Sequence, residues 1–132
     1  LISPLLTQES VASSAIENIH TTTIKVLEVQ ALGEHMIAGP EKEVLHYREA
    51  LLYGYEFIKK HSVIHTNFLV ELQKLIEPSK YGIRKLNGTV IANTHGEVLY
   101  TPPEGEKVIR DLLAQLERFI NEDDGIDSLI KT

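Results

Sequence analysis

The chain of 132 residues contains no cysteine and no tryptophan. The absence of cysteine excludes disulfide bonds and metal sites built from thiolate ligands. Such a composition is compatible with a reducing compartment, and we expect a cytoplasmic location. No apolar run approaches the roughly 18 residues that a membrane-spanning helix needs, so we expect no membrane partner.

Positive charge is also scarce. The chain has 13 Lys and Arg against 19 Asp and Glu, which gives a formal net charge of −6, and no block of basic residues stands out. Binding to nucleic acid depends on a basic surface that neutralises phosphates, so we expect no nucleic-acid partner. His61, His65 and His95 do not share the spacing of helical metal ligands, and we expect no metal site.

Apolar periodicity predicts a mainly α-helical fold with one β-hairpin. The expected helices cover about 7–19, 24–32, 41–60 and 66–76, a fifth follows Pro102-Pro103 and reaches about Ile120, and a last one begins near Asp127. Two strand-like runs, Thr89–Ile91 and Val98–Tyr100, flank the turn sequence Asn93–Gly96. This pattern is typical of a short antiparallel hairpin.

The first expected helix has a threonine at its start and two contrasting faces. Thr7 is a suitable N-cap, and a Thr66 N-cap is expected for the fourth helix in the same way. The expected buried arc consists of Val11, Ala12, Ala15, Ile16 and Ile19, and the expected solvent-facing arc consists of Ser10, Ser13, Glu17 and His20. We therefore expect Ser13 and Glu17 to lie one turn apart on an exposed polar stripe.

Several segments resemble one family in the order in which that family has them. Ser13–Asn18 fits the pattern [S/T]-x-x-x-E-[G/N], which resembles the inhibitory helix of Fic proteins whose inhibitor precedes the catalytic core. The stretch at about 82–103, from Gly82-Ile83-Arg84 through Thr89–Ile91 to Tyr100–Pro103, resembles the family's flap. Val44–Ala50 is similar to another family segment, with His46 where asparagine is more usual.

The resemblance implies a helical Fic-type domain with a hairpin flap. Residues 1–36 would form an N-terminal region with the inhibitory helix, and 37–132 would form the first part of the Fic domain. The family's catalytic signature, His-x-Phe-x-[Asp/Glu]-Gly-Asn-Gly-Arg-x-x-Arg, is absent from the sequence. We therefore assign no catalytic residue to this chain. We expect it to be a catalytically inactive fragment whose missing C-terminal partner carries the signature beyond Thr132.

Fic proteins typically transfer AMP from ATP, with Mg²⁺, to a Ser, Thr or Tyr hydroxyl of a target protein. The resemblance implies that Glu17 pairs with the second arginine of the signature and displaces the γ-phosphate of ATP. Ser13 would orient the Glu17 carboxylate, and Asn18 would tighten the end of the helix. Neither ATP nor Mg²⁺ is expected to bind this fragment alone.

The flap would bind the target protein as an added strand, since an edge strand has unpaired N–H and C=O groups. Arg84, Thr89, Val90 and Ile91 are the candidate docking residues, and Ile91 would hold a neighbouring side chain of the target. A homodimer is a further possible partner arrangement.

Interpretations without a regulatory role stay open. Ser13 and Glu17 fit an ordinary solvated helix face, the hairpin fits a structural edge, and Arg84 fits a surface charge. The chain as a whole could also be a non-catalytic helical binding module, or an antitoxin-like inhibitor that acts in trans on a Fic toxin.

Overall fold

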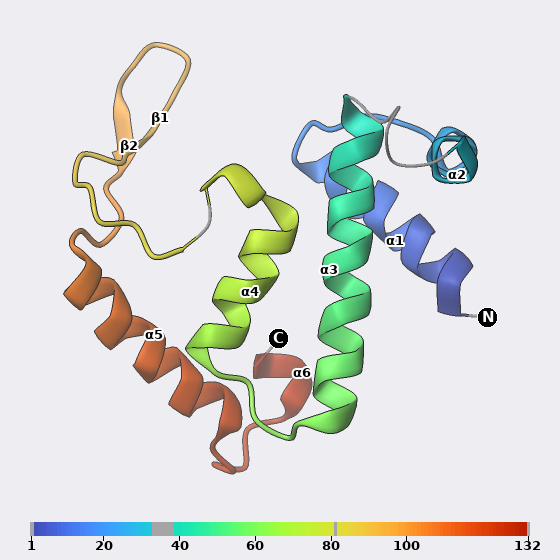
Figure 1. Cartoon of the computed structure of the whole chain (residues 1–132). Helices are drawn as coiled ribbons and strands as arrows, with labels where there is room; N and C mark the ends of the chain where they lie inside the picture. The colour runs from blue at the N-terminus through green and yellow to red at the C-terminus, as the bar shows by residue number, and fades with distance from the viewer. Residues whose placement is uncertain (1, 33–38, 81, 132) are drawn as a thin grey trace. The chain divides into compact units, whose positions relative to one another are not determined.

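The computed structural model describes residues 2–32, 39–80 and 82–131 (Figure 1). The order of elements is α1 (Ile2–Ile16), α2 (Thr23–Leu32), α3 (Pro40–Lys60), α4 (Thr66–Ile76), the 3₁₀ turn η2 (Pro78–Lys80), β1 (Ile91–Ala92), β2 (Val98–Tyr100), α5 (Glu106–Asn121) and α6 (Ser128–Lys131). The predicted fold class, mainly helical with one hairpin, is confirmed.

The described residues fall into two compact units. The first unit contains the residues up to Ser62 together with the stretch that begins at Glu71, and the second contains Val63–Val70 together with the residues from Gly82 onward. Helix α4 is therefore divided between them. The predicted boundary at residues 36 and 37 lies outside the described residues and stays a prediction.

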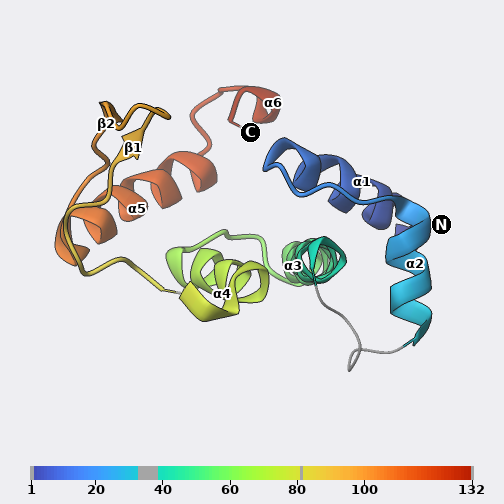
Figure 2. The same cartoon turned by 90° about the horizontal axis from the view of Figure 1, so that it is seen from above.

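Helices α1, α2 and α3 pack together in the first unit. Helix α1 packs along the long helix α3, and α2 contacts both (Figure 1, Figure 2). The buried residues of these helices are Thr7, Ser10, Ser14, Val26, Val44, Ala50 and Gly54. Apart from Val26 and Val44, these residues are alanine, glycine, serine or threonine, whose side chains are small. The core of this unit therefore contains little apolar volume.

The predicted limits of the first helix were wrong. The helix runs over Ile2–Ile16 instead of about 7–19, so Thr7 lies inside it and is not an N-cap. Pro4 is compatible with the earlier start, because a proline in the first turn removes an N–H that has no partner within the helix. Thr7 is 1% exposed, and its hydroxyl accepts a hydrogen bond from Arg48 Nε at 3.0 Å. A contact across 41 positions of sequence was not visible to local pattern analysis.

The predicted faces of α1 were wrong in part, although Glu17 and His20 are exposed as expected. Ser10, expected to face solvent, is fully buried, whereas Ile16, expected in the core, is 83% exposed. Thr7, Ser10 and Ser14 follow an i, i+3, i+7 spacing and form the buried stripe. Small side chains allow the backbone of α1 to approach α3 closely, and close approach selects this face over the apolar one.

The other helix starts agree with the sequence in part. Thr22 caps α2, since its hydroxyl oxygen accepts the amide of Lys25 at 3.3 Å. Pro40 begins α3, a position that suits proline because its missing N–H has no partner in the first turn. The expected cap of α4 was wrong, because His65 takes that place: its Nδ1 accepts the amide of Phe68 at 3.1 Å. Thr66 is instead the first helical residue.

In the second unit, α5 holds the segment that leads into α4. Glu117 Oε2 accepts hydrogen bonds from the amide of Thr66 at 2.9 Å and from its hydroxyl at 3.0 Å. Asn121 bonds both backbone groups of Ile64, at 2.9 Å to the amide and 2.6 Å to the carbonyl. Both α5 residues lie one turn apart, so a single face of the helix satisfies three backbone groups of the incoming chain.

The hairpin has a two-stranded antiparallel sheet in which Ile91 pairs with Tyr100 and Ala92 with Val98. The register shifts by one residue between these pairs. Asn93 builds the turn, because its side-chain oxygen accepts the amides of His95 at 2.9 Å and Glu97 at 3.0 Å. Gly96 completes the turn at φ 83°, a backbone conformation that residues with a Cβ rarely adopt.

Candidate functional site

The end of α1 carries the residues of the inhibitory pattern, and a Schellman motif shapes it. The amide of Asn18 donates to Ala15 O at 3.1 Å, and the amide of Ile19 donates to Ser14 O at 3.0 Å. These are the 5→2 and 6→1 hydrogen bonds of that motif. Asn18 adopts φ 62°, which places it at the left-handed position just after the helix. Glu17 is consequently the last residue before the chain reverses direction.

This geometry gives a physical reason for the final position of the pattern [S/T]-x-x-x-E-[G/N]. A left-handed residue after a helix is commonly Gly and sometimes Asn, since other side chains are strained there. The predicted role of Asn18 in tightening the helix end therefore agrees with the observed backbone. Its side-chain oxygen also lies 3.0 Å from Nε2 of His20.

Ser13 does not orient Glu17 as predicted. Its hydroxyl donates to Glu9 Oε1 at 2.7 Å, one turn earlier in the helix. A serine hydroxyl has one proton to donate, so this bond removes the donor that Glu17 was expected to receive. Glu17 itself lies one residue past α1 instead of on its surface.

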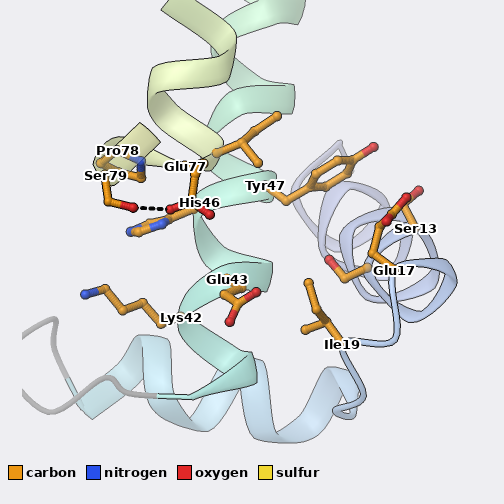
Figure 3. Close-up of a pocket in the computed structure, with 12 residues that line it drawn as sticks. Ser13, Glu17, Ile19, Lys42, Glu43, His46, Tyr47, Glu77, Pro78 and Ser79 are labelled. Atoms are coloured by element: carbon orange, nitrogen blue, oxygen red, sulfur yellow. Dashed lines mark hydrogen bonds between the residues drawn. The ribbon is translucent and has the colours of Figure 1, made fainter. Parts of the chain in front are cut away.

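Glu17 borders a hollow of about 520 Å³ within the first unit (Figure 3). Its wall consists of Ser13, Ser14, Glu17, Ile19, Lys42, Glu43, His46, Tyr47, Ile76, Glu77, Pro78 and Ser79. These residues come from the end of α1, the first turns of α3 and the chain around η2. The side chain of Glu17, just after α1, and that of Glu43 on α3 project toward the same space.

The charged side chains that line the hollow are mostly acidic. Three glutamates, Glu17, Glu43 and Glu77, face one lysine among the lining residues. The Ser79 hydroxyl donates to the Glu77 carboxylate, as the dashed line in Figure 3 shows. Excess negative charge in a concave surface attracts a cation. The site is therefore suited to a guanidinium or an ammonium group rather than to a phosphate.

His46 and Tyr47, adjacent on α3, also line this hollow. Sequence reasoning noted His46 as a departure from the family but did not connect it with Glu17. The spacing of Glu43, His46 and Tyr47, at i, i+3 and i+4, could have indicated a shared helix face. Which segment that face meets depends on tertiary packing and was not predictable.

The candidate docking residues lie in the second unit. Arg84 Nη2 donates to Pro103 O at 2.8 Å and so joins the chain before the hairpin to the chain after it. Gly88 N donates to Glu104 Oε1 at 2.6 Å and makes a second such link. Arg84 therefore has a structural contact at the base of the hairpin, which an isolated surface charge would not have.

The strand at the predicted docking position is shorter than expected. β1 contains Ile91 and Ala92 only, so Thr89 and Val90 precede it. In the observed register these two residues would face Thr101 and Pro102, and a proline has no N–H to continue the ladder. Every strand residue is exposed, and within the described part of the chain neither strand pairs with a third.

Among the described residues, no cluster of three or more His, Cys, Asp or Glu side chains is arranged to hold a metal ion. In the same part of the chain, no helix combines the length and the apolar character required to cross a membrane.

Residues 1–56 match the family model described as "Fic/DOC family N-terminal". The match begins with α1, includes the whole inhibitory pattern and extends into α3. The family predicted from the sequence is confirmed over these 56 residues, which are similar to a Fic/DOC family N-terminal region.

Proposed function

We propose that this chain is the regulatory and target-docking part of a protein adenylyltransferase, which moves AMP from ATP to a Ser, Thr or Tyr hydroxyl of a target protein. The observation that carries the proposal is the position of Glu17. It follows a Schellman-capped helix, borders an acidic hollow and lies within the segment matched to the Fic/DOC family N-terminal region.

The proposed inhibition is a competition between two anions for one guanidinium. An arginine binds a carboxylate or a phosphate through the same pair of parallel N–H donors. If the Glu17 carboxylate occupies the arginine that would bind the γ-phosphate, ATP loses that contact and its α-phosphate is misplaced for in-line attack. The acidic wall formed by Glu43 and Glu77 supports this role, since it favours a cation beside Glu17.

The residues that would carry the chemistry belong to the absent signature. Its histidine would act as general base on the target hydroxyl, and its acidic residue would hold Mg²⁺ against the phosphates. This chain supplies Glu17 as the inhibitor, with Asn18 fixing the backbone that presents it.

The hairpin would present the target to the catalytic part. Ile91 is 57% exposed on β1, and its strand has an edge without a partner strand in the described structure. A target segment that pairs with this edge gains backbone hydrogen bonds without requiring a particular sequence. Arg84 and Glu104 hold the base of the hairpin, so the added strand would bind a fixed surface.

The test is AMP transfer from labelled ATP by the protein of the complete reading frame. Removing the competing carboxylate in Glu17→Gly is expected to raise transfer by about tenfold or more, the effect of an ion pair worth more than 1.4 kcal/mol. Glu122→Gly is the matched control, because Glu122 is an exposed C-cap glutamate at the end of α5. It should leave transfer unchanged.

Two results would overturn the proposal. Equal activation by both variants would mean that any C-cap glycine loosens the protein. An absence of transfer in every variant would remove the enzyme role and leave a helical binding module as the function.

A further inference from the structure

We propose that two hydrogen bonds made by α3 position Glu17, one before it and one after it in the chain. Arg48 donates to Thr7 on α1, and Glu41 accepts from Thr21 beyond the helix end. We call these the Thr7 clamp and the Thr21 clamp. The inference rests on the proposed function, because it concerns the placement of the inhibitory carboxylate.

The Thr7 clamp lies inside the interface between α1 and α3. Arg48 Nε is 3.0 Å from Thr7 Oγ1, and Thr7 is 1% exposed. A hydrogen bond from a charged donor is stronger than a neutral one, so the loss of the Thr7 hydroxyl would remove a strong contact from this interface. This clamp therefore resists sliding or rotation of α1 on α3.

The Thr21 clamp fixes the chain just after the Schellman motif. Thr21 Oγ1 donates to Glu41 Oε1 at 2.5 Å, and the pair is partly buried. The same hydroxyl is the main cause that lowers the pKa of the Glu41 carboxyl, with a smaller contribution from Lys25. Thr21 lies four residues after Glu17, so this bond limits how far the reversed chain can move.

The two α3 residues are seven positions apart, which is close to two full turns, and therefore lie on one face of that helix. Glu43 and His46, which line the hollow, fall between them in sequence. Helix α3 consequently holds the chain at two points, one within α1 and one after its end, and Glu17 lies between them in sequence.

Apolar packing alone provides little restraint on α1. Its stripe against α3 consists of Thr7, Ser10 and Ser14, and the Ser10 hydroxyl donates at 2.6 Å to Leu6 O within its own helix. Leu5 is 65% exposed and Ile16 83% exposed, so neither contributes much burial. Since stabilisation by burial scales with apolar area, polar contacts carry an unusually large share of the attachment.

The experiment uses the protein of the complete reading frame with Thr7→Val and Thr21→Val. Each variant keeps the branched shape and removes the hydroxyl. Ser10→Ala is the control for the first, because its hydroxyl bonds within α1, and Thr23→Val is the control for the second. Amide hydrogen exchange over residues 8–19 and AMP transfer are both measured.

Each clamp variant should accelerate exchange over residues 8–19 by about tenfold, the effect of one lost charge-assisted hydrogen bond. AMP transfer should rise in both, and less than in Glu17→Gly. Adding either clamp variant to Glu17→Gly should change transfer no further, because a misplaced carboxylate matters only when a carboxylate is present. The control variants should exchange and transfer like the wild type.

Unchanged exchange in both clamp variants, or equal acceleration in the controls, overturns the inference. Faster exchange without higher transfer, while Glu17→Gly is active, also overturns it, since the clamps would then hold α1 without positioning Glu17. If Glu17→Gly itself is inactive, the proposed function fails. The inference, which places Glu17 for inhibition, then fails as well. Faster exchange in the clamp variants would identify this case, because it would show that the two hydrogen bonds exist although Glu17 does not inhibit.

Discussion

The amide of Ile19 donates a hydrogen bond to the carbonyl of Ser14, five residues earlier, at 3.0 Å. This bond caps the C-terminal end of α1. This bond reverses the chain directly after Glu17, so the carboxylate is presented at a turn instead of along the helix surface. The left-handed backbone of Asn18 makes the reversal possible. The side chain at position 18 therefore controls where the carboxylate at position 17 lies.

Replacing Asn18 tests this dependence. Asn18→Ala should lower the free energy of unfolding by about 1 kcal/mol, since a Cβ without a compensating polar group is strained at positive φ. Asn18→Gly should retain the wild-type value within a few tenths, because glycine adopts this conformation without strain. Chemical denaturation of the three proteins measures the difference. Equal stability of the alanine and glycine variants would contradict the assigned cap.

Glu117 provides a prediction of pH dependence. The backbone N–H of Thr66 and then its hydroxyl lower the pKa of this carboxyl below its ordinary value of 4.5. A depressed folded pKa adds stability that is present above the unfolded pKa and is lost as the pH falls through the folded value. The Tm of wild type should thus exceed that of Glu117→Gln at pH 7, and the gap should close below about pH 4.

The control for this experiment is Glu56→Gln, a substitution of an exposed glutamate on α3. It should leave no comparable gap at either pH. A Tm difference between wild type and Glu117→Gln that stays constant from pH 7 to pH 3 would show that the carboxylate charge does not strengthen the contact with Thr66.

Ile91 tests the docking role of the hairpin. Ile91→Ser should raise the KM for a protein target by about tenfold, the effect of losing one apolar contact at a binding surface. The ATP affinity and the Tm should stay close to wild type, because this side chain is 57% exposed. Leu86→Ser is the control, since Leu86 is 81% exposed and lies outside both strands. Equal effects of the two variants would refute a specific role for Ile91.

The sequence predicted those elements whose signals are local. The helices expected at about 24–32 and 41–60 are found as α2 and α3, and Thr22 and Pro40 supply start signals within one turn. The turn at Asn93–Gly96 was predictable for the same reason, because asparagine and glycine have strong preferences there. The inhibitory pattern was identified from residues 13–18. The left-handed backbone of Asn18 explains why its last position is Gly or Asn.

Several of the errors concern contacts between distant residues. By its local sequence Thr7 resembles an N-cap, but its hydroxyl instead accepts a hydrogen bond from Arg48. Thr66 also resembles an N-cap, but its amide and its hydroxyl both donate to Glu117. Periodicity assigned the apolar side of α1 to the core, whereas close packing on α3 selected the side with small hydroxyl residues. The hollow beside Glu17 combines three separate segments, and no local pattern indicates such a combination.

The most direct test of the account compares ATP and ADP binding to the protein of the complete reading frame, in wild type and Glu17→Gln, by calorimetry. If Glu17 competes with the γ-phosphate for an arginine, the variant should bind ATP about tenfold more tightly or better, while its affinity for ADP, which has no γ-phosphate, stays unchanged. Equal gains for both nucleotides, or no gain for ATP, would contradict the competition between Glu17 and the γ-phosphate.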